Sequence, residues 1–298
     1  MFLLLPLAFS AVPTFGRLSV KSGKLTGSSG DPVILRGVSL GWDTWWGQFY
    51  NEDTIQHLIT DFHANLIRAA IGIEPTGAYL QNKQLALNHL DAAVKAAIKL
   101  GVYIIIDFHA HQLHTNDAKE FFTTVVNKYK GSEYVIYEIW NEPESANWAT
   151  IKQYAKDVIP VIRNVDPDAV ILVSNSQWDQ HPDGPAADPL PFTNIAYVVH
   201  FYAGTHGSWL RERVTAALAK GIAIFVSECG GMNSDGDGPV STTEWNNWVD
   251  LLEKNKISYA AWCVEAKAES ASILKVSANW NDLTDWGKTV KQTITSRQ

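Results

Sequence analysis

Residues Val135–Pro143 read VIYEIWNEP, and this stretch shows the pattern from which the fold can be predicted. An apolar, β-branched run over Val135–Trp140 passes directly into the polar residues Asn141 and Glu142. Near-continuous apolar runs of this length are typical of parallel strands that are buried on both faces. Seven further runs of the same kind are found along the chain: Val33–Gly37, Asn65–Ala70, Val102–Asp107, Ala169–Ser174, Ile195–His200, Ile222–Ser227 and Ser258–Trp262.

Amphipathic segments with helical periodicity lie between the predicted strands, and several begin at a capping residue or end at a glycine. Eight strand-helix units that repeat every roughly 30 residues indicate an α/β protein with the (β/α)8, or TIM, barrel fold. A doubly wound open sheet is the alternative, but no Gly-rich turn for a dinucleotide follows the first strand. The clearest predicted helices are Leu85–Leu100, Asp117–Tyr129, Ser208–Lys220 and Thr242–Lys254.

The segments at either side of the barrel pattern complete the predicted organisation. Leu18–Leu35 alternates and turns at Gly23 and Gly30, which predicts a β-hairpin ahead of the first barrel strand. Low-complexity segments and linkers are absent from the sequence, so we expect residues 11–298 to form a single domain.

Composition excludes several classes of protein. The 298 residues include 12 Trp, 10 Tyr and 11 Phe, and the net charge is −7, which excludes intrinsic disorder. An acidic chain is poorly suited to phosphate binding, so we expect no nucleic-acid partner. The excess of Trp has two interpretations, a Trp-rich core or a groove whose flat rings stack on flat ligands such as sugars.

Residues 1–10, MFLLLPLAFS, have the character of a secretion signal. The apolar run is too short to span a bilayer, and small residues at Ala8 and Ser10 would allow cleavage before Ala11. An N-terminal strand is the alternative. We therefore expect a secreted, extracellular protein that has no membrane partner.

Two carboxylates stand where buried strands end, Glu142 after the fourth predicted strand and Glu228 after the seventh. The catalytic groups of such barrels lie at the carboxyl ends of the strands. Two facing carboxyl groups can divide the work of glycosidic cleavage, since one donates a proton and the other attacks the anomeric carbon. Arg68, at the end of the second strand, is a candidate for keeping one of them ionised.

Other polar and aromatic residues concentrate at the same strand ends. His109 and His200 are candidates for binding sugar hydroxyls or orienting a carboxylate, and Tyr202 is a candidate donor to the nucleophile. Trp178 and Trp262 are candidates for stacking on sugar rings, whereas Trp42, Trp45 and Trp46 fit the core or the groove equally well. A metal centre built on Asp107, His109, His111 and His200 is an alternative, because His-x-His is also a zinc-ligand spacing. It would leave Glu142 and Glu228 without a role.

The sequence resembles glycoside hydrolase family five, in particular its secreted endo-β-1,4-glucanases (cellulases). The resemblance extends almost from end to end of the chain, and the ordered set of motifs is specific although Asn-Glu-Pro alone is weak. The matching segments include Leu35–Leu40, Ile67–Ala70, Ile105–His109, Tyr137–Pro143, His200–Gly207, Val226–Glu228 and Lys267–Ser270.

The resemblance implies a retaining endo-β-1,4-glucanase in which Glu142 is the acid/base, Glu228 is the nucleophile and Asn141 binds the sugar 2-hydroxyl. It implies a β-glucan substrate, no cofactor and no metal, and we expect a monomer. A non-catalytic sugar binder is the competing class, but both carboxylates are present. The remaining implied substrate-binding residues are Arg68, His109, Trp178, His200, Tyr202, Trp262, Lys267 and Glu269.

The chain departs from the family pattern at Cys229, where relatives commonly have an aromatic residue, and at Cys263, where many have Ser. Strands seven and eight of a closed barrel are neighbours about 4.8 Å apart, a spacing that a disulfide tolerates. We therefore hypothesise a Cys229–Cys263 disulfide. The loop over residues 41–49 also differs from many bacterial relatives.

Overall fold

The structure is a computed structural model that describes residues 13–297. Eight parallel strands form a closed barrel in the order β10-β3-β4-β5-β6-β7-β8-β9, which confirms the predicted TIM barrel. The predicted secretion signal, residues 1–10, lies outside the described residues. The barrel strands are β3 (Arg36–Leu40), β4 (Leu66–Gly72), β5 (Tyr103–His109), β6 (Val135–Glu138), β7 (Val170–Val173), β8 (Ile195–Tyr202), β9 (Ile224–Gly230) and β10 (Tyr259–Val264).

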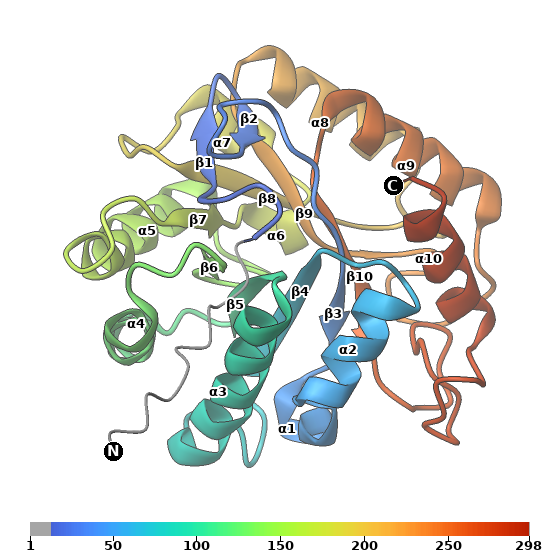
Figure 1. The fold of residues 1–298 in the computed structure, drawn as a ribbon. Coiled ribbons are helices and arrows are strands. Elements are labelled where there is room, and N and C mark those ends of the chain that lie inside the picture. The colour runs from blue at the N-terminus through green and yellow to red at the C-terminus, as the bar shows by residue number, and fades with distance from the viewer. Residues whose placement is uncertain (1–12, 298) are drawn as a thin grey trace, which may run out of the picture.

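Helices surround the barrel on its outside (Figure 1), as expected for strands that are buried on both faces. None of the helices within residues 13–297 combines the length and apolar character needed to cross a bilayer. The helical segments are α1 (Asp43–Trp46), η1 (Gly47–Phe49), α2 (Glu52–Thr60), α3 (Lys83–Leu100), α4 (Thr115–Tyr129), α5 (Trp148–Arg163), α6 (Ser176–Asp179), α7 (Asp183–Ala187), α8 (Ser208–Ala219), α9 (Thr242–Asn255) and α10 (Asp285–Thr295).

The predicted hairpin is present as β1 (Ser19–Lys21) and β2 (Lys24–Thr26), which pair antiparallel. Its two-residue turn has positive φ at Ser22 (50°) and Gly23 (70°), the geometry that matches the twist of a tight hairpin. Leu18 and Leu25 belong to one apolar cluster with buried residues from strands β4 to β10. The hairpin segment therefore packs against the interior of the barrel.

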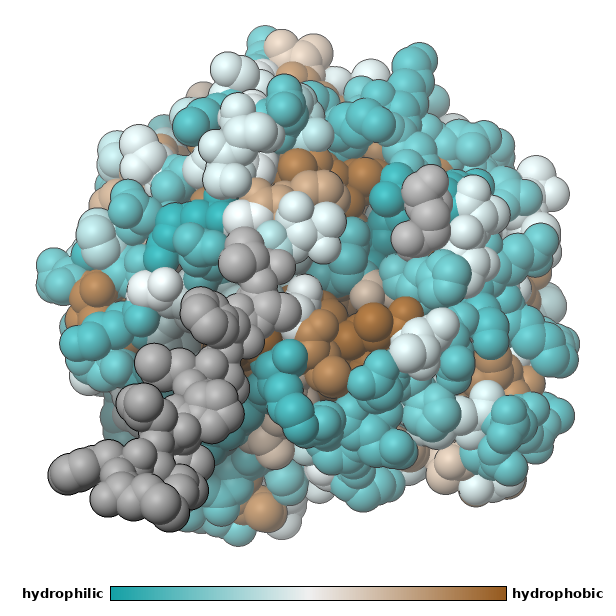
Figure 2. Space-filling view, in the orientation of Figure 1, coloured by the Kyte–Doolittle hydropathy of each residue, from teal (hydrophilic) through white to brown (hydrophobic). Residues whose placement is uncertain are grey.

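The first barrel strand was predicted at Val33–Gly37 but begins at Arg36. Val33 and Leu35 are buried, yet they pack with Leu18 and Leu25 of the hairpin segment and precede the strand. Their apolar character reflects that contact. Figure 2 shows that the face seen in Figure 1 is mostly hydrophilic, with hydrophobic residues gathered near its centre.

Candidate active site

Glu142 and Glu228 face one another at the carboxyl end of the barrel. Glu228 lies in β9, and Glu142 lies four residues after the end of β6. One oxygen of each carboxylate and one ring nitrogen of His200 lie within 4.8 Å of one another. The Glu142 side chain is 13% exposed and that of Glu228 is 6% exposed, so Glu142 is the more accessible group. Both line a cavity of about 500 Å³.

The guanidinium of Arg68 contacts Glu228 and two further carboxylates, Glu138 and Asp107. Arg68 is fully buried, and its Nη1 donates to Oε2 of Glu228 over 2.9 Å. Its Nε donates to Oε2 of Glu138 (2.8 Å), and its Nη2 donates to Oδ1 of Asn141 (2.6 Å) and lies 2.9 Å from Oδ2 of Asp107. Burial alone would lower the pKa of Arg68, but the charges of these three carboxylates raise it well above its usual value. Arg68 is therefore a permanent cation.

Both oxygens of Glu228 accept hydrogen bonds from fixed donors. Tyr202 donates its hydroxyl to Oε1 over 2.7 Å, and Arg68 occupies Oε2. Burial raises the pKa of Glu228, although His200, Arg68 and Tyr202 favour its ionised form. Burial also raises the pKa of Tyr202 well above its usual value, so this hydroxyl remains a donor.

His200 connects Glu142 with Glu138, the residue that ends β6. Its Nδ1 lies 2.8 Å from Oε1 of Glu142, and its Nε2 lies 3.0 Å from Oγ of Ser227, which donates to Glu138. Because the Ser227 proton is committed to Glu138, both ring nitrogens of His200 face acceptors. Burial would lower the pKa of His200, but Asp179, Glu138 and Glu142 raise it well above its usual value.

The contact with His200 also shifts the pKa of Glu142. Burial would raise the pKa of Glu142, but the hydrogen bond and the charge of His200 outweigh burial and lower it. These two shifts favour a protonated imidazole beside an ionised Glu142, with Nδ1 of His200 2.8 Å from the Glu142 oxygen. Two groups this close titrate as a unit.

Trp178 lines the cavity from an unusual turn. The side chain is 44% exposed, and three successive non-glycine residues, Gln177, Trp178 and Asp179, have positive φ values of 52°, 53° and 61°. Each such residue costs of order 1–3 kcal/mol. Asn175 anchors the turn, because its Nδ2 donates to the carbonyl of Val198 in β8 over 2.6 Å.

A second cavity of about 430 Å³ is lined mainly by aromatic residues. The Trp262 ring stacks on His109 at 5.3 Å between centroids, and Nδ1 of His109 lies 2.6 Å from Oδ2 of Asp107. Burial lowers the pKa of His109 well below its usual value, so this ring is neutral. The residues that line the cavity are Trp42, Trp45, Trp46, Trp262, Glu265, Lys267 and Glu269, and the amine of Lys267 donates to Glu269.

The structure brings all the sequence-predicted site residues to this end of the barrel. Glu142, Trp178, His200, Tyr202 and Glu228 line the first cavity. Trp262, Lys267 and Glu269 line the second cavity. Trp42, Trp45 and Trp46, which the sequence could not assign to the core or to the groove, line it as well. Arg68, His109 and Asn141 line neither cavity and are buried. Arg68 contacts Glu228 and His109 contacts Trp262, both of which line a cavity, and Asn141 contacts Arg68.

Sequence reasoning missed Glu138 and Asp179, both fully buried and both close to His200. A signal existed for Glu138, because it is an ionisable residue within the otherwise apolar run Val135–Trp140. Asp179 gave no such signal, since it follows Trp178 in a segment without regular periodicity.

The hypothesised Cys229–Cys263 disulfide is wrong, because both cysteines are buried free thiols. The register pairs Cys229 with Ala261, two residues before Cys263. The Cys229 thiol donates to the carbonyl of Ala260, whereas burial and the charge of Glu265, in the loop after β10, raise the pKa of the Cys263 thiol. The strands are neighbours, as predicted, but the two thiols have different partners.

The alternative metal centre does not match the arrangement of side chains. Within residues 13–297, the residues grouped closely enough to hold an ion are Glu142, His200 and Glu228. His109 and His111 are not among them, and His109 is held by Asp107. The cation of Arg68, 2.9 Å from Glu228, opposes a second cation at the same carboxylate.

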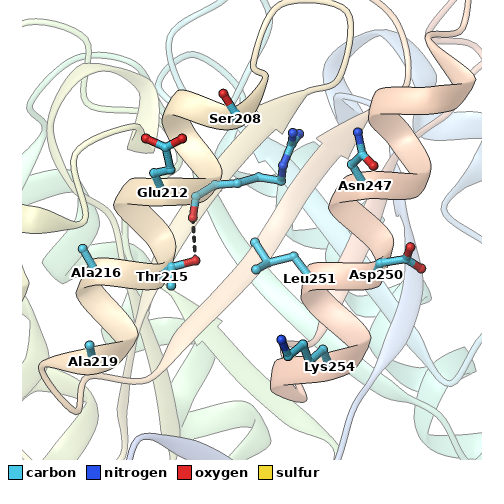
Figure 3. A pocket seen from close by; sticks show the side chains of 10 residues that line it. Ser208, Glu212, Thr215, Ala216, Ala219, Asn247, Asp250, Leu251 and Lys254 are labelled. Carbon is cyan, nitrogen blue, oxygen red and sulfur yellow. Dashed lines mark hydrogen bonds between the residues drawn. The ribbon is translucent and has the colours of Figure 1, made fainter.

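A larger groove, of about 690 Å³, lies between α8 and α9 on the outer helical layer (Figure 3). Ala216, Ala219 and Leu251 form its apolar part, and the guanidinium of Arg211 is paired with Glu244 over 2.5 Å. It lacks the convergent carboxylates found at the barrel end, and we do not assign it to the active site.

Comparison with known proteins gives a consistent result. The family described as Cellulase (glycosyl hydrolase family 5) matches residues 26–268. The chain is 42% identical to Endoglucanase Z of Dickeya dadantii over 266 residues, which cover 87% of this chain and 62% of that protein. It is 39% identical to Endoglucanase N of Pectobacterium atrosepticum, over 96% of this chain and 68% of that protein.

Solved structures agree with the sequence comparison. A protein from Cytophaga hutchinsonii superposes with a TM-score of 0.93 at 39% identity, over 95% of each chain. The catalytic domain of a Thermobifida fusca endoglucanase, solved as a variant in complex with cellotetraose, gives a TM-score of 0.89 at 28% identity, over 94% of this chain and 98% of that chain.

Proposed function

Because the chain belongs to glycosyl hydrolase family 5, the cellulase family, we propose that it is a retaining endo-β-1,4-glucanase that cleaves internal bonds of cellulose-type glucans. The chain spans 62% of the length of Endoglucanase Z. The activity is therefore proposed for this chain and not for a protein of the full length of that relative. We assign the catalytic domain to residues 11–298.

The observation that carries the proposal is the short distance between Glu142 and Glu228. Their nearest oxygens lie within 4.8 Å. Retaining glycosidases hold their two carboxyl groups about 5–5.5 Å apart, whereas inverting enzymes leave about 6.5–9.5 Å for a water molecule. The separation therefore favours direct attack by one carboxylate and a covalent intermediate.

In the first step, Glu228 attacks the anomeric carbon and forms a glycosyl ester, while Glu142 donates its proton to the departing glycosidic oxygen. In the second step, Glu142 removes a proton from water, which attacks the same carbon and releases Glu228 as a carboxylate. Glu228 is the suitable nucleophile, because Arg68 and Tyr202 hold both of its oxygens in place.

The acid step needs a proton on Glu142, and the imidazole of His200, whose Nδ1 lies 2.8 Å from Oε1, can supply it. A bound sugar expels water from the cavity, and desolvation favours neutral groups over an ion pair. The proton then passes from His200 to Glu142 before the glycosidic bond breaks. Asn141 accepts from Arg68 through Oδ1, so its amide N–H groups are free to donate to the sugar 2-hydroxyl.

The two cavities suit a β-1,4-glucan that passes over the carboxylates. Such a chain presents flat sugar faces edged with hydroxyl groups, and Trp178 in one cavity and the tryptophans of the other offer flat apolar rings. Lys267 and Glu269 supply a hydrogen-bond donor and an acceptor beside Trp262. The cellotetraose bound by the Thermobifida fusca enzyme is a ligand of this kind.

We also propose that the protein is secreted and acts as a monomer. The short apolar run within residues 1–10 supports secretion. N-terminal sequencing of protein from the culture medium tests cleavage before Ala11, and light scattering tests the monomer.

The activity is tested by viscosity loss and reducing-sugar release on carboxymethyl cellulose, with mannan and barley β-glucan in parallel. We expect a rapid fall in viscosity with few new reducing ends, which indicates internal cleavage. Preference for mannan would contradict the glucan assignment, and activity that is lost with a chelator and restored by a metal ion would contradict the two-carboxylate mechanism.

A further inference from the structure

Asp179 is a buried residue beside His200 and Glu142, and one of its two carboxyl oxygens has no hydrogen-bond partner among the described residues. Its side chain is fully buried, and its Oδ1 accepts the backbone N–H of Asn175 over 2.6 Å. Its Oδ2 has no hydrogen-bond partner within residues 13–297 and lies 3.6 Å from Nδ1 of His200. Buried polar atoms are rarely left unpaired, and those that are call for an explanation.

Nδ1 of His200 therefore lies between two carboxyl groups. Oε1 of Glu142, at 2.8 Å, faces the cavity, and Oδ2 of Asp179, at 3.6 Å, is sealed from solvent. Asp179 comes from α6, whereas Glu142 follows β6, so the two groups reach the imidazole from separate elements. Further titratable groups that act on this ring or respond to its charge are Asp107, His109, Glu138, His206 and Glu228.

The backbone around Asp179 is held in an unfavourable conformation that fixes this arrangement. Gln177, Trp178 and Asp179 all have positive φ, a region that non-glycine residues seldom occupy. Asn175 ties the turn to β8, and the Trp178 N–H donates to the carbonyl of Pro143 over 3.2 Å. The turn thus presents Trp178 to the cavity while it holds Asp179 next to His200.

We propose that Asp179 is a positioning residue for the acid/base: its buried carboxyl faces the proton that His200 and Glu142 share and retains that proton on the pair. The proposal rests on the proposed function, because it assigns Glu142 the role of proton donor. A negative or proton-binding group beside the pair raises the pH at which the pair loses its proton. Burial also raises the pKa of Asp179 well above its usual value, and Asp179 in turn raises the pKa of His200.

The test is the variant Asp179→Asn, which is close in shape and removes the acidic group. We expect the basic limb of the kcat/KM profile on cellotetraose to move by about one pH unit to lower pH, a loss of about tenfold on that limb. On a dinitrophenyl cellobioside, whose leaving group needs no proton, we expect kcat/KM to stay within about twofold of the wild type. An unshifted basic limb, or an equal loss on both substrates, would overturn the proposal.

Two further measurements separate this role from a structural one. Gln177→Gly relaxes the same turn without touching the carboxyl, and it should leave the pH profile unchanged. In 15N NMR spectra, His200 should lose its proton at lower pH in Asp179→Asn than in the wild type. The NMR readout does not require activity, so an inactive wild type would defeat the proposed function, whereas an unmoved His200 titration would defeat this proposal. If Asp179→Asn does not fold, Asp179→Gly, which accommodates the positive φ of 61° at this position, replaces it in both experiments.

Discussion

Replacing Arg68 with Met should destabilise the protein more than any surface substitution. The guanidinium is fully buried and contacts Glu138, Asn141, Glu228 and Asp107 over 2.6–2.9 Å. Methionine fills much of the volume but leaves the carboxylates without their cation. Removing one partner from a buried ionic network costs about 3–5 kcal/mol, because the remaining charges stay buried and uncompensated.

The magnitude can be measured by guanidinium chloride unfolding followed by Trp fluorescence. With an unfolding entropy of about 2.1 cal/mol/K per residue, a loss of about 3–5 kcal/mol also corresponds to a decrease in Tm of roughly 5–8 °C for a chain of 298 residues. The matched control is Arg36→Met, whose partner Glu253 lies 2.6 Å away in a pair that is partly exposed to water. We expect the control to lose less stability, because the charges of this pair keep partial contact with water. Equal losses in the two variants would refute the argument from burial.

The difference in unfolding free energy between the wild type and Arg68→Met should depend on pH because of Glu138. Burial would raise its pKa, but Arg68 and His200 outweigh burial and lower it in the folded protein. In the wild type, this carboxylate therefore contributes stability at neutral pH that is lost as the pH falls through its folded pKa. Without Arg68, the pKa of Glu138 in the folded protein rises above its value in the unfolded chain. Burial of the ionised Glu138 then destabilises the variant at neutral pH, and this loss of stability disappears in acid because the carboxyl is protonated. The stability difference should therefore be smaller at pH 4 than at pH 7, and a difference that grows in acid would contradict this assignment.

Three further predictions concern the carboxylates and the thiols. Tyr202→Phe removes the hydroxyl that donates to Glu228, so kcat/KM should fall roughly 10- to 100-fold and the acid limb should move to higher pH; an unmoved acid limb would count against the hydroxyl's role. Glu142→Ala should lose about 10²- to 10⁴-fold on glucan but retain activity on an activated aryl cellobioside, with partial rescue by azide; equal losses on both substrates would argue against the acid/base role. A thiol assay in denaturant without reductant should find two thiols, from Cys229 and Cys263, and finding none would restore the disulfide.

The barrel could be predicted from the sequence because buried parallel strands leave a simple record of apolar runs between helical segments. Boundaries were less accurate where burial had another cause. Val33 and Leu35 are as apolar as any strand residue, but they pack with the hairpin segment before β3 begins. Hydrophobicity reports burial and does not say which neighbour provides it.

The site could be predicted where chemistry coincided with strand ends, as for Glu142 and Glu228. Arg68, His200 and Tyr202 could be predicted as their partners for the same reason, since these residues also stand at strand ends. The contacts of Glu138 and Asp179 could not, because they join residues far apart in sequence. Arg68 reaches Glu138 across 70 positions. Asp179 approaches His200 only because of the backbone turn at Gln177–Asp179. That turn could not be predicted, because Gln177 and Trp178 are not residue types that favour positive φ.

The most direct test of the proposed mechanism is to trap the covalent intermediate. A 2-deoxy-2-fluoro cellobioside with a good leaving group should esterify the enzyme and then hydrolyse slowly, because fluorine destabilises both transition states. Peptide mapping by mass spectrometry should place one added glycosyl group on Glu228, and the variant Glu228→Gln should remain unmodified. A glycosyl group on another residue, or turnover of the natural substrate with inverted configuration, would contradict the retaining mechanism built on Glu142 and Glu228.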